Sequence, residues 1–488
     1  MIPTTSQRQS YYADPVIRSR LRDFLGGGPS GKATAVYFAA GTEWEALYRC
    51  PHPLTEWPDW LDMGAELNRS LWDGQSLVAH LDIEYVNFDF PAYPYLEAAR
   101  IFDCQQPVVA AVSSILTESG IVPFHFLTGR GHHFVWRISR LSSAFDRLGK
   151  LGRVSDSLTR LYDSNCGPSG ETVSPELAAA YSGLGLVIEY LAQQIKEMAD
   201  PNCQLPIEMA AVETGSGPRG REVIAVDITE YADPLCSRVI RMPFSVYLKP
   251  WQQRHVLGGV LVDQLDPIFL IPMDGIDLKE GLMIRRNLDA TKAHGARAST
   301  SIPEASEGML SLIQHYSDSP LARFHDWFYS QEHDRRSTWP MTYDRMPFEV
   351  LPPCVAHMLA HPNDLLLRPG CVKRVVRVLL SLGWHPRHIA GLIRSKYEED
   401  HGWDTQWQGY DPATRADFYA RVFAGLFATG EDHLVDFNCQ SAHEQGLCFV
   451  ENCRENLVPF RDSLTNRKNY ERMGCRPFNR LLLSKQHP

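Results

Sequence analysis

Two carboxylates stand two residues apart in the run His80-Leu81-Asp82-Ile83-Glu84-Tyr85. The surrounding residues 76–90 have the β-branched and aromatic composition of a strand, and side chains two apart on a strand point to the same face. Asp82 and Glu84 would therefore repel each other unless a cation joins them. Paired carboxylate oxygens on a rigid strand suit Mg²⁺ or Mn²⁺, particularly where phosphates complete the coordination. An exposed strand face with two solvated acids is the alternative.

A basic turn precedes another strand-like run at Thr128-Gly129-Arg130-Gly131-His132-His133. Glycines let a phosphate approach the backbone, Arg130 supplies positive charge, and a histidine on a strand can hydrogen-bond to a phosphate or a nucleophile. Adjacent strand residues face opposite sides, so only one of His132 and His133 can face the site. A tight hairpin turn with a core histidine is the alternative interpretation.

A third carboxylate, Asp227, follows the apolar residues 223–226. A lone aspartate at such a point is usually a cap or turn residue. Asp227 is a candidate site residue because basic and hydroxyl residues follow it in the sequence. These are Arg238, Arg241, Ser245 and Lys249. Positions 245, 247 and 249 would share one face of an extended segment. Cations and a hydroxyl on one face are what a triphosphate requires.

The order of these three motifs resembles the archaeo-eukaryotic primase superfamily, and in particular the primase small (catalytic) subunit, over about residues 10–275. The resemblance implies a mixed-sheet, RRM-like α+β catalytic core. It implies that Asp82, Glu84 and Asp227 bind divalent metal and that His133, rather than His132, is the histidine of the second motif. It also implies that a set of side chains holds the phosphates of the incoming nucleotide, namely Thr128, Arg130, Arg241, Ser245 and Lys249. Tyr247 stands where the small subunit commonly has histidine.

Besides Cys475, five cysteines lie in the second half of the chain, at Cys354, Cys371, Cys439, Cys448 and Cys453. The last three lack the C-x2-C pairs of most structural zinc sites, and thiolates drawn from distant segments suit an iron-sulfur cluster as well as zinc. Unliganded thiols in a helical core are the third possibility. The earlier cysteines are too scattered to form a zinc knuckle.

This second half resembles the C-terminal domain of the primase large subunit over about residues 350–455. The resemblance implies a [4Fe-4S] cluster, with Zn²⁺ as the alternative, held by Cys354, Cys439, Cys448 and Cys453. Cys371 would then be a packing residue, and Cys475 lies outside the pattern.

The elements that must position these motifs fall into two halves. Strand-like runs at 33–40, 76–90, 123–138 and 221–231, with a helical period over 176–199, predict an α+β domain at 1–289. The Ala-, Ser-, Thr- and Gly-rich residues 290–308 predict a linker. Helical patterns then predict a mostly helical domain at 309–488, with helices over 371–383, 385–400 and 414–428.

The 488 residues include 48 Lys and Arg against 58 Asp and Glu, for a net charge of −10, so the whole chain is not a basic nucleic-acid coat. Positive charge is concentrated at 365–397, which holds seven basic residues and no acid, and at 451–488, which has a surplus of four. We expect this half to contact single-stranded DNA through its cations and through possible stacking groups, which are Trp384, Tyr397, Trp403 and Phe449.

The sequence has no run of about 18 uncharged apolar residues, and its first twenty residues lack the apolar core of a signal peptide. Eleven cysteines, an odd number, argue against a disulfide framework. We therefore expect a cytoplasmic protein without a membrane partner.

The motifs and the resemblance together predict a DNA primase or primase-polymerase. Such an enzyme makes primers on single-stranded DNA from NTPs or dNTPs during DNA replication, and a helicase or another replication protein is an expected partner. A gap-filling or translesion polymerase that extends primers without starting them is the nearest alternative. A metal-dependent nuclease or phosphodiesterase would use Asp82, Glu84 and His133 equally well, but it gives no reason for a triphosphate-binding face. A non-catalytic nucleic-acid-binding protein is the last alternative.

Overall fold

The computed structural model describes residues 2–27, 32–44, 50–403, 407, 409–450, 453 and 456–472. They form two compact units. Unit 1 comprises Met1–Ile207 and Ile224–Gln314, and unit 2 comprises Glu208–Val223 and His315–Pro488. The overall class is α+β, as predicted. No helix in the part of the chain described here is both long enough and apolar enough to span a bilayer.

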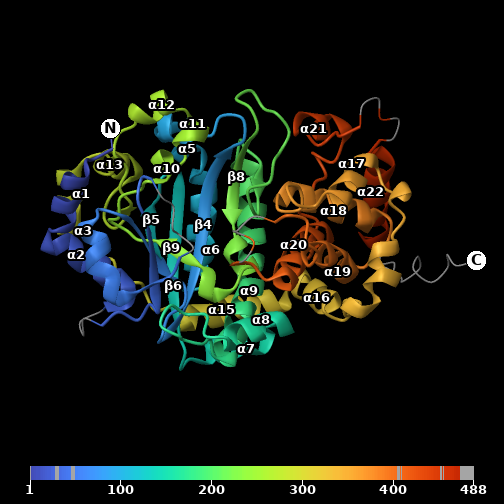
Figure 1. Ribbon diagram of the computed structural model, residues 1–488, viewed down its shortest axis with the longest axis horizontal. Coiled ribbons are helices and arrows are strands. Elements are labelled where there is room, and N and C mark those ends of the chain that lie inside the picture. The colour runs from blue at the N-terminus through green and yellow to red at the C-terminus, as the bar shows by residue number, and fades with distance from the viewer. Residues whose placement is uncertain are drawn as a thin grey trace, which may run out of the picture. The chain divides into compact units, whose positions relative to one another are not determined.

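A six-stranded mixed sheet with β4 near its centre positions the first two motifs (Figure 1). Its strands, in spatial order, are β10 (Ile271–Pro272), β5 (Phe124–Leu127), β6 (Gly131–Ser139), β4 (Ser76–Asn87), β8 (Glu222–Asp227) and β7 (Ile207–Glu208). The strands predicted within 76–90, 123–138 and 221–231 are therefore confirmed. The run at 123–138 folds as two strands, β5 and β6, joined by a turn at residues 128–130.

The antiparallel register of β4 and β6 runs from Ser76 opposite Ser139 to Glu84 opposite Gly131. Alternation along β4 sends Leu81 and Ile83, both fully buried, to one face, and sends Asp82 and Glu84 to the other. Helix α9 (Pro175–Ala199) packs against β4 and against α6 (Gln106–Glu118). The side chains of Asp82 and Glu84 therefore project from a strand that is paired with a neighbouring strand along each edge.

A second, antiparallel sheet in unit 1 carries the third motif's arginine. Its spatial order is β2 (His52–Pro53), β1 (Tyr37–Gly41), β3 (Glu66–Ser70) and β9 (Val239–Arg241). The strand predicted at 33–40 is confirmed as β1, and Arg241 ends the edge strand β9 opposite Asn68 of β3.

Local capping explains where the longest helix begins. The Ser174 hydroxyl accepts a hydrogen bond from the Leu177 amide at 3.3 Å, and Pro175 occupies the first turn of α9, where its missing N–H costs nothing. The helix predicted at 176–199 is thereby confirmed.

Residues 290–308 are not the linker that their composition suggested. They include most of α14 (Leu288–Gly295), in which Thr291 and His294 are buried, and the start of α15 (Ser306–Asp318). Between these helices the chain hydrogen-bonds to Arg137 of β6, which donates to the Pro303 carbonyl and accepts from the Ala305 amide, each at 2.9 Å. Small residues allow this close packing, and they are also what linkers contain. Unit 1 therefore extends to Gln314, and Glu208–Val223 belongs to unit 2.

Unit 2 contains the predicted helices. They are α18 (Pro369–Ser381), α19 (Pro386–Tyr397) and α20 (Pro412–Thr429), each with proline in its first turn. Helix α20 packs against both α18 and α19. The other longer helices of this unit are α16 (Pro320–Phe328), α17 (Pro353–Ala360) and α22 (Val458–Arg472), and the short α21 (Cys439–Glu444) begins at a cysteine.

Candidate active site

Two aspartates on neighbouring strands form no ion pair with any lysine or arginine among the described residues, and the His133 ring lies beside one of them. Asp82 lies within β4, and Asp227 is the last residue of the adjacent β8. Burial, then the nearby Glu84, raises the pKa of Asp82 to about 6. Burial, then Asp82, raises the pKa of Asp227 to about 7. The Asp82 Oδ1 atom is buried and accepts no hydrogen bond from the described residues. These two carboxylates therefore fit a bound cation.

Glu84 is neutralised by cations of the chain itself. The Arg130 guanidinium donates to Glu84 Oε1, and Lys249 Nζ lies 4.0 Å from the same oxygen. Although burial opposes it, the charges of Arg130 and Lys249 lower the pKa of Glu84 to about 2. Burial and Arg130 lower the pKa of Lys249 to about 8. The Arg130 side chain holds Glu84, and among the described residues no ligand atoms from three of Asp82, Glu84, Asp227 and His133 come within 4.8 Å of one another.

The structure places His133 beside Asp82 and turns His132 to the opposite face. His133 opposes Asp82 in the β4–β6 register, with Nε2 3.4 Å from Asp82 Oδ2. His132 Nδ1 instead lies 2.9 Å from His125 Nε2. Burial, then His80, lowers the pKa of His133 well below its ordinary value, so the His133 ring is neutral.

Two further residues, His80 and Glu230, belong to this cluster, although motif matching did not select them. The His80 ring lies 4.4 Å from the His133 ring, and His80 Nδ1 is 2.8 Å from Glu230 Oε1. Burial opposes charge on His80, but Glu230 outweighs it and raises the pKa of His80. The two-residue period of β4, which puts His80 on the face of Asp82, was the available signal for His80. Glu230 has no comparable signal.

Packing dictates the two glycines of the second motif. A Cβ atom at Gly129 would lie 2.1 Å from the Tyr247 ring, and one at Gly131 would lie 1.8 Å from the Ile83 carbonyl oxygen. Both distances are impossible for a side chain, so only glycine lets the turn sit against Tyr247 and β4. Thr128, which is buried, closes the turn by donating its amide to the Gly131 carbonyl at 2.8 Å.

Arg241 is held beside Tyr247 by a buried acid. Its Nε donates to Glu66 Oε1 at 3.1 Å, and its guanidinium lies 5.0 Å from the centre of the Tyr247 ring. Glu66 is fully buried and also accepts from the Leu248 amide at 2.8 Å. The Tyr247 hydroxyl lies 3.2 Å from that of Tyr95. Tyr247, at the position where histidine was expected, thus takes part in the internal packing that supports Arg241.

Ser245 does not face the site, contrary to the expectation that it holds a phosphate. It is fully buried, and its hydroxyl accepts the Leu67 amide at 2.8 Å. The expectation assumed one extended segment over 245–249. Phe244 has instead a φ of 63°, and Lys249 begins the short helix α10 (Lys249–Gln252), so the alternation of a strand does not apply.

All seven basic residues of 365–397 have partners within unit 2, so this run is not the open phosphate-binding face that its charge suggested. Most partners are acids, and three of these interactions are buried. The pairs are Arg368–Glu213, Lys373–Glu208, Arg374–Gln445, Arg377–Asp432, Arg387–Asp417, Arg394–Glu398 and Lys396–Asp344. Tyr397 is also buried, with its hydroxyl on the Leu366 carbonyl. Much of 451–488, with Cys475, lies outside the described residues.

The four cysteines singled out in unit 2 line one cavity of about 640 Å³. They are Cys354 in α17, Cys439 at the start of α21, and Cys448 and Cys453. The Leu457 amide donates to Cys439 Sγ at 3.4 Å. Cys371 is fully buried inside α18 and does not line the cavity. The donor set therefore fits a thiolate-bound metal.

The raised pKa values make a prediction for metal-free protein. Between about pH 4 and pH 7 the folded state retains protons on Asp82 and Asp227 that the unfolded state has lost, so stability falls as the pH rises through this window. The free energy of unfolding of Asp227→Asn should exceed that of wild type by an amount that grows with pH and reaches roughly 2–4 kcal/mol at pH 8. Urea unfolding in EDTA from pH 5 to pH 8 measures the difference, and a difference independent of pH would contradict the assignment.

No protein-family model, curated protein or solved structure matches the chain.

Proposed function

We propose that the chain is a template-directed nucleotidyltransferase of the primase type, which joins nucleotides on single-stranded DNA and releases pyrophosphate. One observation carries the proposal. Carboxylates from motifs that lie far apart in the sequence stand on adjacent strands, with three cations, Arg130, Arg241 and Lys249, grouped near Glu84. A carboxylate pair that fits divalent metal next to a cationic group that fits a triphosphate is the composition that nucleotidyl transfer requires.

In this proposal Asp82 and Asp227, with Glu84, would hold Mg²⁺ or Mn²⁺. The bound ions would supply activation of the attacking 3′-hydroxyl and neutralisation of the leaving pyrophosphate. Arg130 and Lys249 form salt bridges with Glu84 and would exchange this carboxylate for phosphate oxygens. Positioning of the triphosphate by fixed cations contributes more to phosphoryl transfer than proton transfer does.

Neutral His133 would act as a hydrogen-bonding group beside the aspartates. Neither of its ring nitrogens has a hydrogen-bond partner among the described residues, and its side chain is nearly buried. A buried polar group without a partner is costly unless a ligand supplies one. The ring therefore suits a contact to substrate or to a nucleotide phosphate.

For unit 2 we propose a [4Fe-4S] cluster on Cys354, Cys439, Cys448 and Cys453, in a domain that binds the template and the 5′ end of the new primer. A zinc ion with four sulfur ligands at about 2.3 Å needs the sulfurs about 3.8 Å apart. Among the described cysteines no three sulfurs come within 4.8 Å of one another, and the cavity of about 640 Å³ is larger than a zinc ion needs. The cavity has room for a cluster, and iron and zinc analysis decides between the two metals.

The test is synthesis without a primer. Purified protein is incubated with single-stranded DNA, labelled NTPs or dNTPs, and Mg²⁺ or Mn²⁺, and both new oligonucleotides and released pyrophosphate are measured. We expect both products to depend on the template and to disappear in EDTA. Extension of a supplied primer with no synthesis in its absence would assign a primer-extending polymerase instead. Degradation of DNA without pyrophosphate would assign a nuclease, and neither activity would leave a binding protein.

A further inference from the structure

Arg285 carries a buried positive charge that no acid among the described residues meets. It follows α13 (Leu278–Ile284) and is 2% exposed. Its guanidinium donates to the Thr128 carbonyl at 2.9 Å and to the Gly129 carbonyl at 3.3 Å, and lies 5.0 Å from the centre of the Phe102 ring. A buried guanidinium without a carboxylate is costly. Arg285 lies outside all three motifs, yet both of its side-chain hydrogen bonds go to the turn of the second motif.

Every carbonyl of that turn is held by a donor of the protein. Arg285 holds those of Thr128 and Gly129, as described above. The Arg130 carbonyl accepts from the Tyr85 amide at 3.2 Å and from Gln105 Nε2 at 3.1 Å. The Gly131 carbonyl accepts from the Thr128 amide. The amides of Gly129 and Arg130, by contrast, donate to no described residue. Backbone amides without an acceptor, beside an arginine side chain, are donors that an anion could use.

We propose that Arg285 is the positioning residue of the nucleotide-binding turn. By fixing the carbonyls of Thr128 and Gly129, it keeps their negative ends away from the triphosphate and leaves the amides of Gly129 and Arg130 for phosphate oxygens. Lysine cannot replace it, because one ammonium group does not offer the planar fork that reaches two carbonyls. This inference rests on the proposed function.

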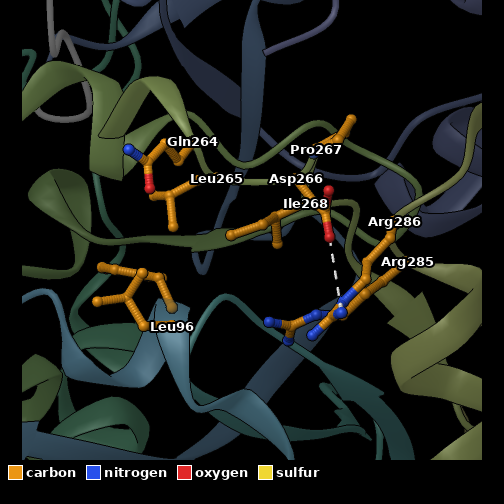
Figure 2. Close-up of a pocket in the computed structure, with 9 residues that line it drawn as sticks. Leu96, Gln264, Leu265, Asp266, Pro267, Ile268, Arg285 and Arg286 are labelled. Atoms are coloured by element: carbon orange, nitrogen blue, oxygen red, sulfur yellow. Dashed lines mark ion pairs between the residues drawn. The ribbon is translucent and has the colours of Figure 1, made fainter. Parts of the chain in front are cut away.

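The neighbouring Arg286 provides a matched control. Figure 2 shows Arg285 and Arg286 side by side at a small pocket, with Asp266 joined to Arg286. The volume of this pocket is about 130 Å³. Arg286 is 45% exposed, and its guanidinium lies 3.6 Å from Asp266. Arg286 is the same residue type one position along the chain. Among the described residues, it makes no contact with residues 128–131.

The experiment measures binding and turnover for Arg285→Lys, Arg285→Met and Arg286→Met. Isothermal titration with ATP, ADP and adenosine in Mg²⁺ gives the affinities, and nucleotide incorporation gives kcat and KM. We expect both Arg285 variants to bind ATP at least tenfold more weakly, with a smaller loss for ADP and none for adenosine. The KM for ATP should rise tenfold with kcat changed less than threefold. Arg286→Met should stay within twofold of wild type.

A purely structural role for Arg285 would not produce a loss that grows with the number of phosphates. Thermal melting without nucleotide identifies any variant that fails to fold, and Arg285→Lys, which keeps the charge, then carries the test. If wild type binds ATP and Arg285→Lys binds it equally well, the inference is overturned and the proposed function stands. Wild type that binds no nucleoside triphosphate overturns both.

Discussion

Asp82→Asn and Asp227→Asn are expected to lower the rate of nucleotide incorporation by about 10³-fold or more. Divalent ions contribute several kcal/mol to this type of reaction, and each 1.36 kcal/mol is a factor of ten in rate. Asp82 shares one face of the sheet with Glu84 and His133, and the pKa of each aspartate is raised by burial first and by another carboxylate second. Asparagine keeps the shape and removes the charge that the metal needs.

The same substitutions should leave the protein folded, because they remove mutual repulsion from a buried site. Calorimetric titration with Mn²⁺ should show binding to wild type that both variants lose. Asp266→Asn is the control, since the Asp266 carboxylate is 62% exposed and pairs only with Arg286 among the described residues. If either variant keeps wild-type incorporation, the assignment of these carboxylates to metal is wrong.

The strands that hold the site were predictable because their patterns are local. The period of two along β4 sets Asp82 and Glu84 on one face whatever the strand pairs with. Choosing between His132 and His133 needed the resemblance, because alternation says only that one of them faces the site. The register, with His133 opposite Asp82, places it there.

Residues that support the site from a distance could not be predicted in the same way. Glu66, Glu230 and Arg285 contact Arg241, His80 and the turn at 128–130 across long stretches of sequence. Nothing in the residues next to them records those partners. A long-range contact becomes visible only once the sheets bring the segments together.

The errors share a physical cause, which is that composition does not report pairing. The basic run at 365–397 read as a free cationic face, but α18 buries three of its cations against partners that include Glu208 and Asp432. Glu208 is the last residue of β7, and it falls in the segment Glu208–Val223, which belongs to unit 2 rather than to the domain predicted at 1–289. Ser245 was misplaced for a related reason, since one residue with positive φ ended the assumed strand.

Replacing any one of Cys354, Cys439, Cys448 and Cys453 by serine is expected to remove the metal centre of unit 2. Protein purified without oxygen should be brown, with the broad visible absorbance of an iron-sulfur cluster, and each variant should lose that colour together with its iron. Loss of a thiolate-held metal removes folding free energy directly. At a cost of several kcal/mol, the thermal midpoint of unit 2 should drop by about 10 °C or more.

Cys371→Ser is the matched control for this set. Cys371 is fully buried within α18 and away from the cavity lined by the other four cysteines, so the variant should keep full iron content even if the new hydroxyl lowers stability. Iron and zinc analysis of all five variants separates metal loss from general destabilisation. One equivalent of zinc in colourless wild type, lost in the same four variants, would keep the ligands and change the metal. Iron lost equally from Cys371→Ser would show that the cavity does not define the ligand set, because a thiol outside it would then matter as much as the four that line it.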